Sequence, residues 1–224
     1  MTGLILEIGD CVDIGRQQLL HIEELNICFE WGFSGCAMIN YFAYGSNLLR
    51  QRIQLRNPSA TFIGVGCLLN YKLDFCGHNR NWNGSTATVV PMKDERVFGV
   101  IWQLDDTDLP SLDHQEGVPV EYVPETVQVT CYAKGIDEIY TCRTYMAISK
   151  DFNLPSPYYL DIILRGAVQA KLPESYIKKL RCIKHNRLFD VCPLYASVLS
   201  ILEPSKRQNY EVDDLREMQT NKPS

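Results

Sequence analysis

The pattern of apolar and polar positions changes character near residue 38. Residues 1–38 alternate acidic residues with short apolar pairs and show no sustained period, so we expect a weakly determined N-terminal extension there. An apolar run at 39–44 ends at Gly45, and a helical pattern follows at 48–53. The pattern therefore predicts a strand, a turn and a helix, and it places the start of a compact domain at residue 39.

Strand-like segments dominate as far as residue 150. Apolar and alternating runs predict strands at residues 62–76, 86–91, 96–104, 126–131 and 140–145. The third run is apolar on both faces, which suits the centre of a sheet, and the last two form a hairpin. Gly64 and Gly66 are predicted points of a bulge or of close backbone approach. This order predicts an α+β fold in which a mostly antiparallel, barrel-like sheet has helices packed at its side.

Start and stop signals place the helices. The predicted helices span residues 105–116, 156–170, 173–183 and 195–202. Asp105 or Asp106 is expected to cap the first helix and Gly117 to end it, while Ser156 and Pro157 open the second. We expect the domain to span residues 39–186, followed by a C-terminal extension at 187–224 whose last twenty residues are mobile.

Composition narrows the class of protein. The 224 residues include 22 Lys and Arg against 27 Asp and Glu, a net charge of −5 without a basic block, which argues against nucleic-acid binding. No basic and apolar leader opens the chain, and no apolar run reaches the roughly 20 residues that span a membrane. Nine cysteines occur without CxxC or zinc spacing. We therefore expect a soluble, cytoplasmic protein with no metal and no membrane or nucleic-acid partner.

The turn after the first strand is one candidate site. Gly45 allows close backbone approach, and Ser46 or Asn47 is a natural N-cap for the following helix. Free amides at a helix N-terminus bind anions or carboxylates. A tight turn that only starts a helix is the plainer alternative, and the local sequence taken alone favours it.

The end of the 105–116 helix is a second candidate. Asp113 and Glu116 are three residues apart and share a helix face, and Glu116 directly precedes the stop residue Gly117. A carboxylate in that place can be aimed into a cleft, although acidic residues near helix ends are more often solvated. Arg143 and Tyr145 share one face of their strand.

Six blocks of sequence together resemble the γ-glutamylcyclotransferase family. They are YFAYGSNL at 41–48, RNPSA at 56–60, YKLDF at 71–75, LD with QEGV within 112–118, TCR with Tyr145 at 141–145, and PSP with Tyr159 at 155–159. The blocks occur in the family's order and cover about residues 40 to 185. Enzymes of this family release an amino acid from a γ-glutamyl amino acid while the glutamyl part closes into 5-oxoproline.

The resemblance implies a small mixed β-barrel with flanking helices, a homodimer, and a lyase or acyltransferase reaction of glutathione metabolism that uses no cofactor or metal. Its small-molecule substrate would be a γ-glutamyl compound. Glu116 matches the catalytic acid/base. The residues that match substrate-binding positions are Tyr41, Phe42, Ala43, Tyr44, Gly45, Ser46 and Tyr159, with weaker matches at Asn47, Leu48, Tyr122 and Tyr145.

This chemistry needs alignment and proton transfer, because the substrate's own α-amine attacks its γ-carbonyl. We expect Glu116 to accept a proton from the ammonium and to return one to the departing amine, a task that a raised pKa suits. Backbone donors of the 45–48 turn would hold either the substrate carboxylate or the developing oxyanion.

Other interpretations stay open. A binding protein could keep this fold without turnover, although the presence of Glu116, the turn and Tyr159 speaks against it. Residues 27–42 could anchor to a membrane surface, but Glu30 and the glycines leave no clear amphipathic face. A cyclotransferase specific for γ-glutamyl-amines or for glutathione would use the same chemistry.

Overall fold

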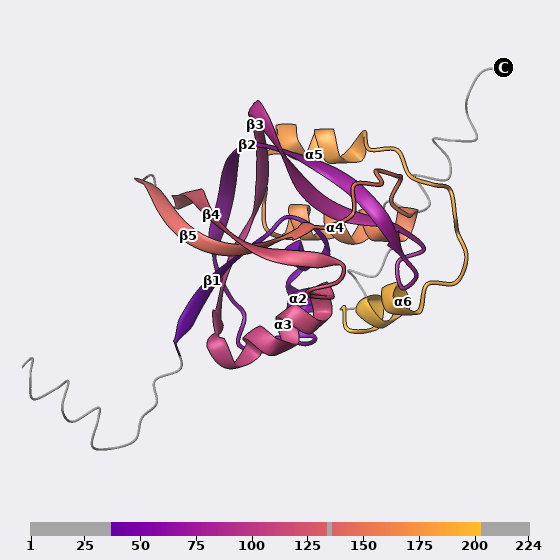
Figure 1. Cartoon of the computed structure of the whole chain (residues 1–224), viewed down its shortest axis with the longest axis horizontal. Helices are drawn as coiled ribbons and strands as arrows, with labels where there is room; N and C mark the ends of the chain where they lie inside the picture. Colours follow the sequence, from indigo (N-terminus) through magenta and orange to yellow (C-terminus); the bar gives the residue numbers. More distant parts are fainter. Residues whose placement is uncertain (1–36, 134–135, 203–224) are drawn as a thin grey trace, which may run out of the picture. The chain divides into compact units, whose positions relative to one another are not determined.

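A computed structural model describes residues 37–133 and 136–202 (Figure 1). The strands are β1 (Met38–Ala43), β2 (Thr61–Asn79), β3 (Gly84–Asp105), β4 (Tyr122–Ala133) and β5 (Ile136–Ala147). They form a closed barrel in the order β1-β3-β2-β4-β5. The neighbours are antiparallel except where Tyr41 of β1 pairs in parallel with Arg143 of β5 and closes the barrel. This confirms the predicted α+β fold with a mixed, mostly antiparallel barrel.

Short helices surround the barrel. They are η1 (Ser46–Leu48), α2 (Arg50–Gln54), η2 (Asp106–Asp108), α3 (Leu109–Glu116), α4 (Pro157–Gln169), α5 (Glu174–Arg181) and α6 (Pro193–Ser200). Helix α4 is the most buried of them and packs against η1, α5 and α6 (Figure 1). No helix in the described part of the chain is both long enough and apolar enough to cross a bilayer.

Strand β3 corrects one prediction, because the separate strands expected at 86–91 and 96–104 are a single strand. Its partner β2 runs alongside it over most of its length, with Tyr71 opposite Pro91 and Leu69 opposite Arg96. Between these pairs the register shifts, and Asn70 and Asp94 adopt left-handed backbone with φ of 62° and 66°. The exposed residues 92–95, of which 93–95 are charged, therefore form an irregularity within a long hairpin, because pairing with β2 overrides the local turn signal.

The segment after β1 corrects a second prediction. Instead of one helix over 48–53, Leu49 is extended, with φ −77° and ψ 120°, and separates η1 from α2. Neither Ser46 nor Asn47 caps a helix through its side chain. The Asn47 side chain instead points away to contact Tyr41 and Glu116.

Of the other predicted helix-end residues, some act as predicted and some do not. Ser156 caps α4 by accepting from the amide of Tyr159 at 3.1 Å, and Gly117 ends α3 in the left-handed conformation with φ 69°, both as predicted. The predicted caps Asp105 and Asp106 form no such bond. Asp108 precedes α3, and its carboxylate accepts from Ser59 instead.

Glycines in the barrel lie where the chain needs them. The β2–β3 register shifts between Phe62 and Gly64, and a Cβ on Gly66 would lie 2.5 Å from Cγ1 of Val129 on β4. These positions agree with the predicted bulge and close approach. Phe42 and Ile101, which are paired across β1 and β3, are both wholly buried in the core.

Residues 187–202 pack on the domain. The hydroxyl of Tyr195 on α6 lies 2.8 Å from Asp161 on α4, and Tyr158 donates to the carbonyl of Phe189. Residues 1–36 and 203–224, which include most of the expected N-terminal extension and the expected mobile end, lie outside the described residues. The division of the chain at residues 38 and 186 stays a prediction.

Gly166 sets the distance between α4 and the turn after β1. A Cβ built on Gly166 would lie 2.5 Å from the amide nitrogen of Leu49 and 2.6 Å from the carbonyl carbon of Leu48. Backbone atoms cannot give way as a flexible side chain can. A residue without Cβ is therefore needed for α4 to pack directly on η1.

We expect Gly166→Ala to lower the free energy of unfolding by about 1–3 kcal/mol, because overpacking outweighs the gain of roughly 1 kcal/mol in helix propensity. Denaturant unfolding monitored by circular dichroism measures this. The control is Val168→Ala, at a half-exposed position of the same helix, which should change stability little. Stabilisation by Gly166→Ala would contradict the close packing.

Candidate active site

A pocket opens where all five strands, the turn after β1 and the helices α2, α3 and α4 meet. Its lining residues are Tyr41, Tyr44, Gly45, Ser46, Asn47, Arg52, Asn79, Trp82, Thr86, Ala87, Gln115, Glu116, Glu121, Tyr122, Tyr145 and Tyr159. Five tyrosines contribute to this wall, so the pocket combines apolar ring surface with hydroxyl groups. The charged side chains of the lining are Arg52, Glu116 and Glu121.

Glu116 stands at the C-terminal end of α3 with its carboxyl group held from the turn after β1. The Asn47 Nδ2 group donates to Glu116 Oε1 at 2.8 Å and lies 3.1 Å from the Tyr41 hydroxyl. The Tyr41 hydroxyl makes a longer contact of 3.5 Å to the same carboxylate oxygen. Gln115 in turn donates to Asn47 Oδ1 at 2.9 Å, so the Asn47 amide cannot flip without losing partners.

The environment of Glu116 changes its acidity. Burial raises the pKa of Glu116 from 4.5 to about 7, and this effect exceeds the opposing influence of the nearby Arg52 cation and of the hydrogen bonds from Tyr41, Gln115 and Asn47. A carboxyl group with a pKa near neutrality accepts and returns protons readily at physiological pH. This property, together with its place in the pocket, marks Glu116 as a proton-transfer group.

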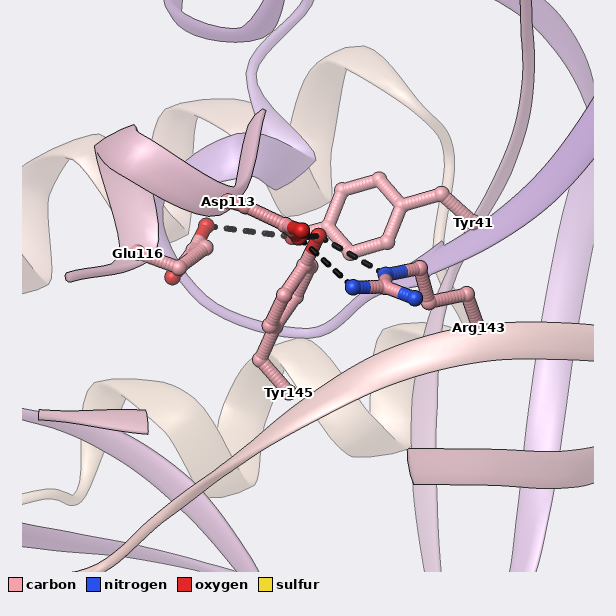
Figure 2. A network of polar contacts seen from close by, with 5 residues as sticks. All are labelled: Tyr41, Asp113, Glu116, Arg143 and Tyr145. Atoms are coloured by element: carbon pink, nitrogen blue, oxygen red, sulfur yellow. Dashed lines mark hydrogen bonds and ion pairs between the residues drawn. The ribbon is translucent and has the colours of Figure 1, made fainter. Parts of the chain in front are cut away.

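A second network anchors α3 one turn earlier (Figure 2). Arg143 Nη2 and the Tyr145 hydroxyl, both on β5, donate to Asp113 Oδ1 at 2.7 and 2.5 Å. Arg143 Nε also donates to the Tyr145 hydroxyl at 3.0 Å. Asp113 and Glu116 thus occupy one face of α3 as predicted, but Asp113 ties the helix to the barrel while Glu116 faces the pocket.

Two tyrosines hold the opposite wall. The Tyr122 hydroxyl lies 2.7 Å from the carbonyl oxygen of Ala87, and the Tyr159 hydroxyl accepts from the amide of Ala87 at 3.1 Å. Burial raises the pKa of Tyr159 to about 12, so its hydroxyl keeps its proton at neutral pH. Gly45 lets the turn after β1 approach Tyr159, because a Cβ at this position would lie only 2.9 Å from the Tyr159 hydroxyl.

The structure brings together most of the residues expected at the site. Tyr41, Tyr44–Asn47, Tyr122, Tyr145, Tyr159 and Glu116 all line the pocket. Phe42, Ala43 and Leu48 are buried in the core and do not belong to the lining, so substrate contact by these residues stays a prediction. The Leu48 amide is also taken, because it donates to the Gly45 carbonyl within the turn at 3.0 Å.

The sequence reasoning missed Arg52, Trp82 and Gln115. Arg52 lies in the short helix α2, where nothing in the local sequence distinguishes it from a solvent-exposed arginine. Trp82 lies in the polar loop between β2 and β3 and belongs to no apolar period of a helix or strand. Gln115 belongs to the QEGV block but received no role of its own. The isolated tryptophan in this polar loop is the local signal that could have indicated this wall of the pocket.

The described residues contain no group of three or more His, Cys, Asp or Glu side chains arranged to hold a metal ion. What the pocket offers is one buried cation, a half-buried carboxyl group with a neutral-range pKa and a set of hydroxyl donors. This combination defines an acid/base site for a small polar molecule.

Comparison with known proteins identifies the family to which this site belongs. The γ-glutamylcyclotransferase of Bos taurus is 44% identical over 151 residues, which cover 65% of this chain and 79% of that protein. The Homo sapiens γ-glutamylcyclotransferase is 42% identical over 152 residues, with the same coverage. The chain therefore belongs to the γ-glutamylcyclotransferase family.

Two further comparisons agree. Residues 96–180 match the model of the AIG2-like family. A solved structure of a γ-glutamyl cyclotransferase superposes with a TM-score of 0.69 at 36% identity, over 73% of this chain and 99% of that one. The barrel and its flanking helices are thus shared with this solved relative.

The hydrogen bond from Asn47 favours the ionised form of Glu116, so its removal should raise the pKa of Glu116 further. We expect the carboxyl ¹³C signal of Glu116 to titrate with a midpoint at about pH 7 in the unaltered protein. In Asn47→Ala the midpoint should lie higher. The control is Asn79→Ala, which removes a pocket amide bonded to Glu121 instead. An unchanged or lower midpoint in Asn47→Ala would contradict this electrostatic role.

Proposed function

We propose that this protein is a γ-glutamylcyclotransferase that converts γ-glutamyl amino acids into 5-oxoproline and a free amino acid, with Glu116 as the acid/base. The observation that carries the proposal is the Glu116 carboxyl group, held by Asn47 in the tyrosine-lined pocket with a pKa of about 7. Membership of the γ-glutamylcyclotransferase family supports it.

The reaction transfers an acyl group within one molecule. A bond forms between the substrate's α-nitrogen and its γ-carbonyl carbon, and the bond from that carbon to the amino-acid nitrogen breaks. The attacking nitrogen loses two protons as it changes from ammonium to ring amide, and the leaving nitrogen gains two as it departs as ammonium. A single carboxyl group that accepts and returns protons can therefore serve both halves of the reaction.

Alignment of the substrate contributes the rest of the rate enhancement. A flexible γ-glutamyl chain must bring its amine to within bonding approach of its own carbonyl, and a narrow pocket with several fixed walls restricts it to such conformers. The Tyr159 hydroxyl accepts from Ala87, which leaves its proton to be donated to an oxygen of the substrate. We assign Tyr159 to the γ-carbonyl oxygen, where negative charge develops.

The finer expectations belong to the same proposal. We expect γ-glutamyl amino acids rather than γ-glutamyl-amines or glutathione to be preferred, since the turn keeps the FAYGSN sequence. A cytoplasmic location, a role in glutathione metabolism and a homodimer are likewise proposed. A binding protein without turnover is the alternative that the following measurement excludes or supports.

Glu116→Gln should lower the rate of 5-oxoproline release by roughly 10²-fold or more, because glutamine keeps the size of the side chain but cannot accept a proton. The assay uses γ-glutamyl-L-amino acids, a γ-glutamyl-amine and glutathione, with no metal added. The matched control is Glu121→Gln, which alters the other, exposed glutamate of the pocket and should keep most of the activity. No release from any substrate by the folded, unaltered protein would reject the enzyme in favour of a binding role.

The pH dependence follows from the raised pKa of Glu116. Below about pH 7 the carboxyl group is protonated and cannot accept the proton of the substrate ammonium, so kcat/KM should fall on the acidic side with a midpoint near 7. The residual activity of Glu116→Gln should lack this acidic limb. A limb that persists in the variant would assign the titration to another group.

A further inference from the structure

Arg52 is a buried cation without a counter-ion among the described residues. Only 6% of its surface is exposed, and its Nε and Nη1 groups have no hydrogen-bond partner in the described part of the chain. No carboxylate among the described residues lies within ion-pair distance of it, although Glu116 is close enough to influence its pKa. The guanidinium carbon lies 6.0 Å from the centre of the Trp82 ring, which supports the charge only from one side.

Such a group weakens the folded state. Burying a charge without a partner costs free energy, and each unsatisfied donor adds to that cost. Buried arginines are normally paired for this reason. An arginine that remains unpaired next to a pocket is explained when the missing acceptor is a ligand, because strain and unsatisfied groups concentrate at binding sites.

The position of Arg52 specifies which ligand group it meets. Among the described residues that line the pocket, Arg52 is the one basic side chain, and Glu116 and Tyr159 contribute to the same lining. Planar carboxylates match the fork of guanidinium donors. The ligand group is therefore a carboxylate that can lie beside the groups that perform the chemistry.

We propose that Arg52 binds the α-carboxylate of the γ-glutamyl group. This inference rests on the proposed function and goes further by assigning the recognition of that group. The α-carboxylate and the α-amine are attached to the same carbon atom, so a carboxylate held at Arg52 places the amine next to it, on the side of Glu116. The carboxylate of the leaving amino acid lies beyond the amide bond, and a γ-glutamyl-amine lacks it altogether.

The assignment also explains how a carboxylate substrate enters a site that already contains Glu116. A second negative charge near Glu116 opposes its ionisation, whereas the Arg52 cation favours it. Binding of the α-carboxylate at Arg52 pairs the incoming charge with the cation. Glu116 then remains able to act as the base.

A pair of cyclic ligands tests the carboxylate without turnover. 5-Oxoproline keeps the former α-carboxylate, and 2-pyrrolidone is the same ring without it. Isothermal titration with the full chain should find 5-oxoproline at least about tenfold tighter than 2-pyrrolidone, since a charge-assisted hydrogen bond contributes that much or more. In Arg52→Gln the ratio of the two dissociation constants should fall toward one. Equal binding of both rings by the unaltered protein would overturn the proposal.

A set of substrates tests the same contact during turnover. Arg52→Gln should lower kcat/KM at least about tenfold for γ-glutamyl-alanine and for γ-glutamyl-methylamide. The effect should be much smaller for 4-aminobutanoyl-alanine, which lacks the α-carboxylate. A loss for the two alanine compounds that spares γ-glutamyl-methylamide would assign Arg52 to the leaving group instead, and an equal loss for all three would assign it a general structural role; either result overturns the proposal.

Stability separates binding from folding. Arg52→Gln and Arg52→Met remove an unpaired buried cation, so Tm should stay equal or rise, whereas a structural arginine would give a fall in Tm. Arg52→Lys keeps the charge and should retain part of the preference for 5-oxoproline, which provides a test if the neutral variants fail to fold. The control is Arg56→Gln. Arg56 is exposed, lies four residues after Arg52 and does not line the pocket, so this change should leave binding and kinetics unchanged.

The proposed function and this inference can fail separately. Turnover with an unaltered ligand preference in Arg52→Gln rejects the role of Arg52 and leaves the cyclotransferase in place. Absence of turnover with Arg52-dependent binding of 5-oxoproline rejects the cyclotransferase and keeps the carboxylate site.

Discussion

The buried side chain of Asn47 is the connection on which the arrangement of the pocket depends. Its amide donates to Glu116, its oxygen accepts from Gln115, and its backbone carbonyl accepts from the indole of Trp102 at 2.9 Å. One residue thereby joins the turn after β1, the end of α3 and strand β3. A buried amide with all these partners resists displacement, because any shift leaves a buried polar group unsatisfied. The contacts that fix the turn therefore also fix the carboxyl group.

Helix α3 is held at two points on one face. Asp113 is bound by Arg143 and Tyr145 of β5, and Glu116 is bound by Asn47. The first contact anchors the helix to the barrel wall, and the second sets the direction of the side chain that enters the pocket. Gly166 permits α4 to pack closely on the backbone of Leu48 and Leu49, and this packing helps to hold the turn that carries Asn47. A carboxylate at the end of a short helix, which local forces would leave in solvent, is in this way kept half-buried.

The two charges at the centre of the pocket are kept near each other without forming a direct ion pair. A direct ion pair between Arg52 and Glu116 would hold the carboxyl group ionised and would lower its pKa. In the observed arrangement burial has the larger effect, and the pKa of Glu116 rises to about 7. The guanidinium, unpaired among the described residues, remains in place at a cost to stability. Functional sites commonly retain such a cost, since chemistry and recognition need groups that a purely structural core would exclude.

The sequence by itself determined the features whose physical cause lies within a few residues. The end of α3 at Gly117, the cap at Ser156, the β4–β5 hairpin and the apolar run at 97–102 of β3 were all predicted from local patterns. The resemblance to a family connected Glu116 to the turn. Tertiary structure decided the rest: β3 is one strand because β2 pairs with it, and Asn47 leaves its capping role to meet Glu116, a residue 69 positions away. The unpaired state of Arg52 also depends on which distant side chains surround it. Local signals act over a turn of helix, whereas these contacts exist only after the barrel has closed and brought remote segments together.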